Sequence, residues 1–375
     1  MYICILCVYV RRSVYMDKEL FVEMLGIDST SGKEAGFADF LSERLLTSKC
    51  RVEKFEVGDG TKNLLFSWGE PKVVFCSHLD TVPPYIPPVV DETTVYGRGS
   101  CDAKGQIFSM YEACKVLESE GYEGFGLLLL AGEETGSFGA KAFREQHPGA
   151  EWVIVGEPTD NCMASASKGT KAFEVTFEGK AFHSGYPQYG VSAVELFNDF
   201  MNALRSIVFP KDDILGDTTW NVGKLVSDNP QNILSDRLSC RVYFRTTFES
   251  DVMVSNVMKN IAGPDAKLRF GRRTVQDGSD IVGKDVAQWQ KLMTVRALGG
   301  DAPTRYDTLE GFPVKPVAFG SDAPQLTNFG RKILCGPGSI LVAHRPEEHI
   351  LISDLTKATE NYVHIYKTLV NKENI

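Results

Sequence analysis

The chain has 375 residues, of which 43% are hydrophobic and 24% charged, and its formal net charge is -9 at pH 7. This composition excludes a disordered or low-complexity protein, and the negative charge argues against nucleic acid or an anionic membrane surface as the main partner. The length predicts two domains. The nine cysteines are scattered singly, which indicates buried thiols in a reducing compartment, so we expect a cytoplasmic protein.

The first fifteen residues are predicted to be an extension ahead of the folded domain. Residues 1–10 are apolar but too short to span a bilayer, and the basic pair at 11–12 follows the apolar part instead of preceding it as in a signal peptide. An ordinary amphipathic helix is expected from Met16 onward. We therefore expect Met16 to be the natural start and residues 1–15 to be an upstream or non-native addition.

Helix and strand signals then alternate, which predicts an α/β domain with a central, mostly parallel sheet. Residues 31–34 have the spacing of a helix-capping box, and a strand pair is expected at 52–57 and 63–68. Further buried strands are predicted from short apolar runs at 73–76, 127–130 and 152–155.

Each of these three apolar runs is followed by acids or a histidine. His78 and Asp80 follow the first run, Glu133 and Glu134 the second, and Glu157 the third. The carboxyl ends of parallel strands meet at one edge of a sheet, where open α/β sheets bind their ligands. Any one of these acids could be an ordinary solvated loop residue, but three such strand ends indicate a shared site. A histidine oriented by a nearby carboxylate is also the common arrangement of a metal-ligating imidazole.

A glycine-rich loop at residues 97–105 carries one carboxylate, Asp102, and precedes a helix with an apolar face. A tight turn or a phosphate-binding loop is the competing interpretation. The loop matches neither the dinucleotide-binding pattern nor the P-loop lysine spacing, so a nucleotide-binding enzyme is not favoured.

The pattern of apolar and polar residues along the chain changes near residue 166. Residues 171–178 and 238–244 alternate apolar and polar side chains, which predicts strands of a sheet with one solvated face, and an amphipathic helix lies between them. We therefore expect an inserted α+β domain over residues 166–276 and a catalytic domain formed by residues 16–165 and 277–375.

Five motifs, in order, extend over almost the whole chain after Met16. They are Ser-His-Leu-Asp-Thr-Val at 77–82, Gly-Arg-Gly-Ser-Cys-Asp-Ala-Lys-Gly at 97–105, Gly-Glu-Glu-Thr-Gly at 132–136, Gly-Glu-Pro-Thr at 156–159, and Gly-Pro-Gly at 336–338 with Ala-His-Arg-Pro-Glu-Glu at 343–348. In these motifs the chain resembles the co-catalytic zinc amidohydrolase and carboxypeptidase family that includes acetylornithine deacetylase, succinyl-diaminopimelate desuccinylase and bacterial glutamate carboxypeptidase.

The resemblance implies a zinc-peptidase-like catalytic domain that holds two zinc ions per subunit, for which cobalt or manganese can substitute. His78 and Glu157 would bind one ion, Glu134 and His344 would bind the other, and Asp102 would bridge the two. Such a bridging carboxylate suits a two-metal site, where it reduces the repulsion between the ions.

The resemblance also implies roles for three further residues. Glu133 would be the general base, and Asp80 would be the partner that orients His78. His183 would otherwise be an exposed loop histidine. By resemblance it would stabilise the oxyanion, often from a partner subunit, which makes the insert a ferredoxin-like lid that forms a homodimer.

Substrate contacts are implied at five positions. Lys168, Asn232 and Arg245 would bind a substrate carboxylate, although each could equally be a solvated polar residue of the insert. Ser321 and Asp322 follow a predicted strand and would line the pocket.

Together these residues imply metal-dependent hydrolysis of the amide bond of a small N-acyl amino acid. Glu157 stands where dipeptidase and tripeptidase relatives tend to carry Asp, so the chain is more similar to deacylases and carboxypeptidases. Residues 232–235 read Asn-Ile-Leu-Ser where many members have Asn-Val-Ile-Pro, which puts the local pocket shape in doubt.

Acetylornithine or acetylcitrulline deacetylase, or the succinyl counterpart, in arginine biosynthesis is the first expectation. Succinyl-diaminopimelate desuccinylase and a general aminoacylase or carboxypeptidase are the alternatives. A non-catalytic binding protein of the same fold is not favoured, because all five ligands and the base are present.

Overall fold

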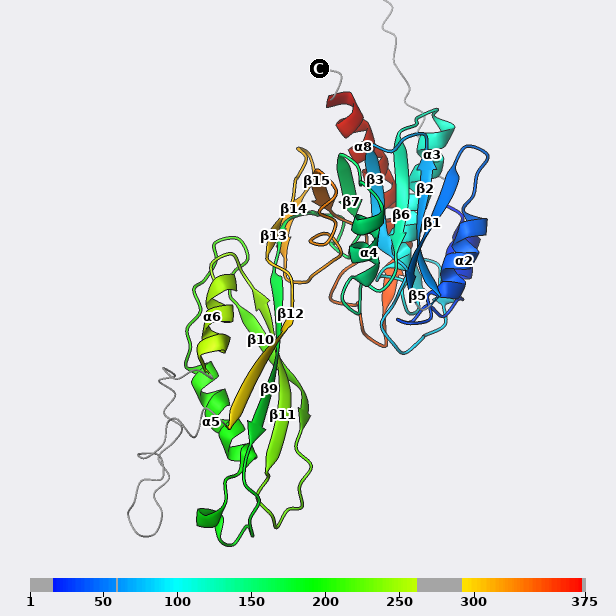
Figure 1. Ribbon diagram of the computed structural model, residues 1–375. Helices are drawn as coiled ribbons and strands as arrows, with labels where there is room; N and C mark the ends of the chain where they lie inside the picture. Colours follow the sequence, from blue (N-terminus) through cyan, green and yellow to red (C-terminus); the bar gives the residue numbers. More distant parts are fainter. Residues whose placement is uncertain (1–15, 59, 262–291, 373–375) are drawn as a thin grey trace, which may run out of the picture. The chain divides into compact units, whose positions relative to one another are not determined.

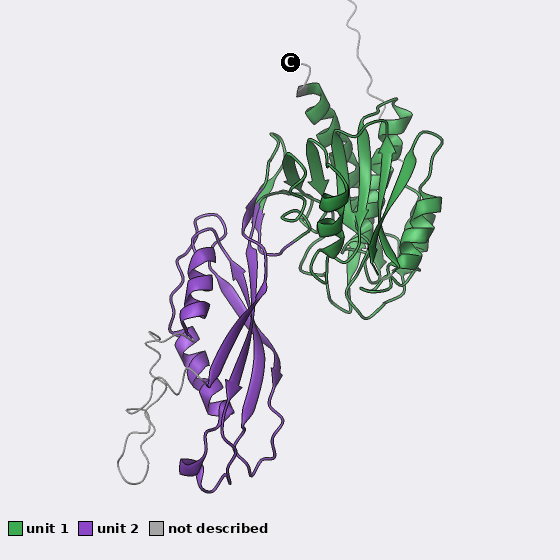
Figure 2. Ribbon diagram, in the orientation of Figure 1, with its two compact units in different colours: residues 1–165, 306–315, 321–375 green, residues 166–305, 316–320 purple. Residues whose placement is uncertain are grey.

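The structure is a computed structural model that describes residues 16–58, 60–261 and 292–372. The expectation for residues 1–15 therefore lies outside the described residues. The chain divides into two compact units (Figure 2). Unit 1 comprises Met1–Ser165, Tyr306–Lys315 and Ser321–Ile375, and unit 2 comprises Ala166–Arg305 and Pro316–Gly320.

Unit 1 is built on a sheet of six strands within the described residues (Figure 1). In sheet order they are β1 (Arg51–Gly58), β2 (Thr61–Trp68), β6 (Phe125–Leu130), β3 (Val73–His78), β7 (Trp152–Val155) and β15 (Arg331–Leu334). Neighbours from β6 to β15 pair in parallel, whereas β2 is antiparallel to both β1 and β6. All these strands except β2 thus run in one direction, which confirms the expected mostly parallel sheet.

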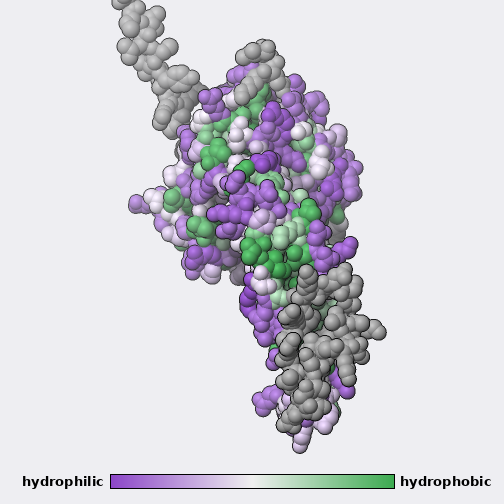
Figure 3. All heavy atoms as spheres, turned by 90° about the vertical axis from the view of Figure 1, so that its left-hand side faces the viewer, coloured by the Kyte–Doolittle hydropathy of each residue, from purple (hydrophilic) through white to green (hydrophobic). Residues whose placement is uncertain are grey.

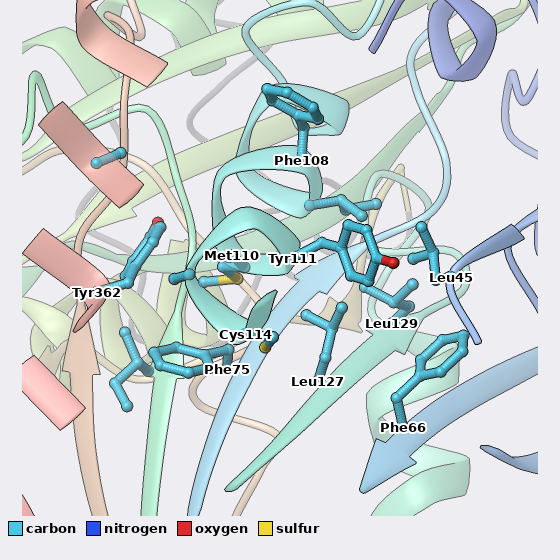
Figure 4. Close-up of a cluster of buried hydrophobic side chains, with 14 of the residues drawn as sticks. Leu45, Phe66, Phe75, Phe108, Met110, Tyr111, Cys114, Leu127, Leu129 and Tyr362 are labelled. Carbon is cyan, nitrogen blue, oxygen red and sulfur yellow. The ribbon is translucent and has the colours of Figure 1, made fainter. Parts of the chain in front are cut away.

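Helices cover both faces of this sheet because its inner strands are apolar on both sides. The helices are α1 (Lys18–Leu25), α2 (Ala35–Arg44), α3 (Lys104–Ser119), α4 (Phe138–Gln146) and α8 (Ile352–Lys372). Figure 4 shows Phe75 and Leu127 in one cluster with Cys114 of α3. The Phe75 ring also meets the ring of Tyr362 of α8 edge to face, with 5.7 Å between the ring centroids. On the other face, Phe143 of α4 packs against Phe55 of β1 at 5.2 Å. Each fully buried side chain of this kind contributes about 1.5–3 kcal/mol.

Two small sheets contain six further strands of the described residues. One contains β4 (Val89–Val90), β5 (Thr94–Tyr96) and β16 (His349–Leu351), and the other contains β8 (Met163–Ser167), β13 (Thr304–Arg305) and β14 (Val314–Val317). The predicted buried thiols are also present, since Cys76, Cys114 and Cys240 are buried and free.

Unit 2 is an antiparallel sheet with helices on one face (Figure 1). Its described elements are β9 (Gly169–Glu178), the short 3-10 helix η1 (Pro187–Tyr189), α5 (Ala193–Arg205), β10 (Thr219–Val226), β11 (Arg237–Thr246), α6 (Asp251–Ile261) and β12 (Met293–Gly299). Phe173 and Val242 lie in the core under the helices, whereas Glu174 on the opposite face forms an ion pair with Arg296 at 2.6 Å. The predicted sheet with one solvated face is thus confirmed.

The last strand of unit 2 corrects the expected end of the insert at residue 276. Unit 2 begins at Ala166 as expected, but β12 pairs with β9, and the unit runs to Arg305. Met293 is buried in the core of unit 2. The alternating pattern of a strand does not reveal which sheet the strand joins, so the sequence alone placed this segment in the catalytic domain.

The surface is mixed in character. The face drawn in Figure 3 is mostly hydrophilic, with hydrophobic side chains gathered in limited patches. Among the helices of the described residues, none has the length and apolar character needed to cross a membrane.

Candidate metal centre

Three adjacent parallel strands bring the predicted acids and histidine to one edge of the sheet of unit 1. β3 ends at His78, β6 ends three residues before Glu133, and β7 ends two residues before Glu157. The strand order places β3 between β6 and β7. The side chains that follow these strands are therefore neighbours, although they are far apart in the sequence.

Two clusters of ligand-type atoms lie at this edge. The side chains of His78, Asp102 and Glu157 each offer one atom, and these atoms lie within 4.8 Å of one another; the same holds for Asp102, Glu134 and His344. Asp102 belongs to both clusters. Its Oδ1 lies 3.1 Å from His78 Nε2 and its Oδ2 lies 3.2 Å from His344 Nε2. One carboxylate thus stands between two ligand sets.

Burial and neighbouring charge perturb the pKa values of these groups. Burial raises the pKa of Glu157 well above its ordinary value, and the negative charge of Glu133 adds to this effect. Burial also opposes ionisation of Asp102, but hydrogen bonds with both histidines outweigh it and hold its pKa below the ordinary value. Hydrogen bonds with Asp102 and Glu134 raise the pKa of His344 to about 10. The cluster thus concentrates carboxyl groups in a poorly hydrated place, where cations would stabilise them.

The donor set fits two divalent ions. Each cluster supplies one imidazole nitrogen and two carboxylates, which are ligand types that zinc accepts. A catalytic zinc ion commonly has three protein ligands and a fourth position open to water or substrate. The shared Asp102 would let two such ions lie side by side.

Asp80 holds two neighbouring strand ends together. The Nδ1 atom of His78 donates to the Asp80 carbonyl oxygen at 2.9 Å, which leaves Nε2 free of hydrogen in the neutral ring. The Asp80 carboxylate accepts the backbone N–H of Glu133 at 3.0 Å and that of Glu134 at 3.2 Å. The predicted partner of His78 therefore also fixes the backbone that presents the predicted base and a predicted ligand.

Ser31 supports Asp80 and is a residue whose role the sequence did not reveal. Its hydroxyl donates to the Asp80 carboxylate at 2.9 Å. The helix-capping box predicted at residues 31–34 is therefore wrong: Glu34 accepts from the backbone N–H of Gly32, and α2 begins only at Ala35. No local signal could have found a contact between residues 49 positions apart.

Glu348 is a second residue that the sequence left without a role. Its carboxylate is buried and accepts backbone N–H groups of the glycine-rich loop, and it forms an ion pair with Arg98. The only signal was the pair of acids that ends the last motif. The two acids differ in environment, because the Glu347 side chain is 71% exposed whereas Glu348 is buried.

Ser321 and Asp322, the two residues predicted to line the pocket, lie buried in unit 1. The Ser321 hydroxyl accepts the N–H of Ala323 at 3.3 Å. Burial raises the pKa of Glu133 well above its ordinary value, and the negative charge of Asp322 adds to this effect. Asp322 is therefore close to the predicted base.

Lys168 and Arg245 are neighbours in unit 2. Residue 168 precedes β9, and the register pairs Thr170 with Arg245. Burial lowers the pKa of Lys168, and the positive charge of Arg245 lowers it further. The Lys168 ammonium group donates to the carbonyl oxygen of Asp217, so it is already engaged by the backbone.

His183 and Asn232 lie on adjoining exposed segments of unit 2. His183 Nδ1 accepts the N–H of Gly185 at 3.0 Å, which places the hydrogen of the neutral ring on Nε2. The backbone carbonyl oxygen of Asn232 accepts the backbone N–H of Ser184 at 2.9 Å. His183 thus presents a donor from an ordered loop.

Comparisons with known proteins identify the family and the fold of the chain. The family described as Peptidase family M20/M25/M40 matches residues 74–368. A peptidase M20 domain-containing protein of Schizosaccharomyces pombe is 31% identical over 356 residues, covering 92% of this chain and 82% of that protein. A protein of Aspergillus oryzae named a probable carboxypeptidase is 31% identical over 386 residues, covering 91% and 84% respectively. The solved structure of a Staphylococcus aureus tripeptidase has a TM-score of 0.75 at 20% identity, covering 94% of this chain and 98% of that chain, which is a likeness of fold.

Proposed function

The chain belongs to peptidase family M20/M25/M40, and from this premise we propose that it hydrolyses an amide bond whose amine side is an amino acid with a free carboxylate. The observation that carries the proposal is the position of Asp102 between two ligand sets. A buried carboxylate whose two oxygens face different histidines suits a two-metal hydrolase, because one side chain can serve both ligand sets.

The metal ligands follow from the two clusters. His78, Asp102 and Glu157 would hold one divalent ion, and Asp102, Glu134 and His344 would hold the other. When bound there, zinc ions, or cobalt or manganese in their place, would supply polarisation of an acyl carbonyl and a lowered pKa, of about 7, for a water molecule.

Glu133 is the proposed general base. Its carboxylate accepts the proton of the attacking water and then transfers that proton to the nitrogen of the leaving amine. Burial and the charge of Asp322 raise its pKa, which suits a group that must both accept and donate a proton near neutral pH. The bond from its N–H to Asp80 fixes the position of its backbone.

His183 is the proposed donor to the oxyanion, acting from a partner subunit of a homodimer. Its Nε2–H is available, because Nδ1 is occupied as an acceptor. Among the described strands, β10 forms one edge of the sheet of unit 2, and its Leu225 and Val226 are 53% and 58% exposed. An edge strand with exposed apolar side chains can pair with a second copy of the chain, which supports the proposed dimer.

The free carboxylate of the substrate is proposed to bind Arg245, assisted by Lys168 and Asn232, with Ser321 in the pocket. Two neighbouring cations in unit 2 support this anchor. The narrower prediction from the sequence is an N-acetylornithine or N-acetylcitrulline deacetylase. A carboxypeptidase is the second candidate, supported by the name of the Aspergillus oryzae relative and by the glutamate at position 157.

The test is hydrolysis of a substrate panel with zinc or cobalt present and with a chelator. The panel contains N-acetylornithine, N-acetylcitrulline, N-succinylornithine, N-succinyl-diaminopimelate and an N-blocked dipeptide, each beside the same compound with its α-carboxylate converted to an amide. The proposal predicts chelator-sensitive turnover of at least one acid and little turnover of its amide. Equal turnover of acid and amide would contradict the carboxylate anchor, and chelator-resistant turnover would contradict the metal mechanism.

A further inference from the structure

Glu348 is bound to the glycine-rich loop through both its side chain and its backbone. Its Oε1 accepts the backbone N–H groups of Gly99, Cys101 and Asp102, each at 3.0 Å. Its carbonyl oxygen accepts the N–H of Gly97 at 3.0 Å. Three amides that converge on one oxygen fix the peptide planes of the loop up to the residue that carries the shared carboxylate.

Burial of the Glu348 carboxylate is unfavourable, so hydrophobic packing does not explain why a charged side chain lies there. The side chain is buried, burial raises the pKa of Glu348, and the negative charge of Asp102 raises it further, whereas Arg98 opposes both effects. Arg98 pairs with the other carboxylate oxygen, Oε2. Burying the Glu348 carboxylate near the Asp102 carboxylate costs free energy. The hydrogen bonds that offset this cost come from the loop that carries Asp102.

The same acid joins two ligand-bearing segments. His344 lies four residues before Glu348 and has a φ of 61°, a left-handed conformation that a non-glycine residue adopts only when its surroundings hold it there. Asp102 lies at the end of the loop that Glu348 binds. Because Asp102 Oδ2 and His344 Nε2 are 3.2 Å apart, a shift of either segment would change the spacing of the ligand atoms.

From this geometry we propose that Glu348 is a positioning residue that holds the shared carboxylate of Asp102 against His344 and so sets how tightly the chain binds divalent ions. The inference rests on the proposed function, because it concerns the same ligand clusters. Glu348 belongs to neither cluster of ligand-type atoms. It acts through the backbone of the loop at residues 97–102.

The experiment is a titration of the metal-free, full-length chain with Zn²⁺ by calorimetry and with Co²⁺ by visible absorption, which reports ligand geometry. Glu348→Ala is expected to bind the ions about 10- to 100-fold more weakly, with an altered Co²⁺ spectrum, as found when the partners of metal ligands are removed. Glu348→Gln is expected to lose about three- to tenfold, because a neutral carbonyl accepts the same N–H groups less strongly than a carboxylate. Glu347→Ala is the matched control and should bind as the wild type does, since its side chain is exposed.

Circular dichroism of each metal-free variant establishes that it is folded before titration. A folded Glu348→Ala variant with wild-type affinity and spectrum would overturn the inference, and if this variant does not fold, the same result for Glu348→Gln would overturn it. Wild-type binding is the separate test of the proposed function. If the wild type binds ions and the Glu348 variants match it, only the positioning role fails; if the wild type binds none, the proposed function fails and the positioning role fails with it.

Discussion

The predicted functional residues of unit 1 and of unit 2 are held in opposite ways. In unit 1, His78, Glu134 and Glu157 follow buried strands. Hydrogen bonds to Asp80 and Glu348 fix the backbone that presents Glu134 and Asp102. In unit 2, His183 and Asn232 lie on exposed segments. Buried, multiply bonded positions suit groups that must keep a fixed geometry, and exposed loops suit groups that meet a substrate or a second subunit. We therefore propose that unit 1 holds the metal ions and the general base, whereas unit 2 supplies the oxyanion donor and the contacts to the substrate carboxylate.

The largest expected effect is that of Glu133→Ala, which separates catalysis from metal binding within unit 1. The variant should lose about 10²- to 10⁴-fold in kcat, because a positioned base contributes a factor of this size. Its metal content should stay at the wild-type level. Glu134→Ala is the matched control, since it should lose both metal and activity. An equal loss of metal in the two variants would mean that Glu133 is itself a ligand.

His183→Ala tests whether unit 2 contributes to the reaction. Losing an oxyanion donor should lower kcat by about 10²- to 10³-fold and leave metal content unchanged. If His183 acts on the site of a partner subunit, mixing the inactive His183→Ala and Glu133→Ala chains should restore part of the activity in hybrid dimers. A mixture that stays inactive although hybrid dimers form would show that His183 does not act across subunits.

Arg245→Met tests the carboxylate anchor. A hydrogen bond to a charged group is worth about 1.5–3 kcal/mol, so KM should rise about 10- to 100-fold while kcat changes little. Arg241→Met on the same strand, whose side chain is 42% exposed and lies 4.0 Å from Glu174, is the control and should leave KM unchanged. A similar rise in KM for both variants would indicate a general charge effect in place of an anchor.

Ser31→Ala should have the smallest effect and tests the support of Asp80. Removing one of the hydrogen bonds to this carboxylate should lower the free energy of unfolding by about 0.5–1.5 kcal/mol, measured by urea denaturation. Ser119→Ala, which removes a hydroxyl from an exposed helix end, should change it less. No difference between the two variants would show that Ser31 does not support Asp80.

Local patterns were enough to predict the buried strands of unit 1 and the side chains that follow three of them, whereas Asp102 and His344 were predicted as ligands only from the family resemblance. His78, Glu133 and Glu157 each follow a short apolar run, so the rule for parallel strand ends applies to them directly. Contacts between distant segments were not predicted. Nothing near Ser31 or Glu348 indicates their partners 49 and 246 residues away, and the pairing of β12 with β9 is equally non-local. The engagement of Lys168 by the Asp217 carbonyl likewise leaves no trace in the sequence.

The most direct test of the central claim is the number of metal ions that the metal-free chain binds. Because Asp102 belongs to both ligand sets, the account predicts two Zn²⁺ ions per wild-type chain and weakened binding of both ions in Asp102→Ala. Elemental analysis after equilibrium dialysis would measure both quantities. A single ion per wild-type chain, or an Asp102→Ala variant that still binds two ions tightly, would contradict the account.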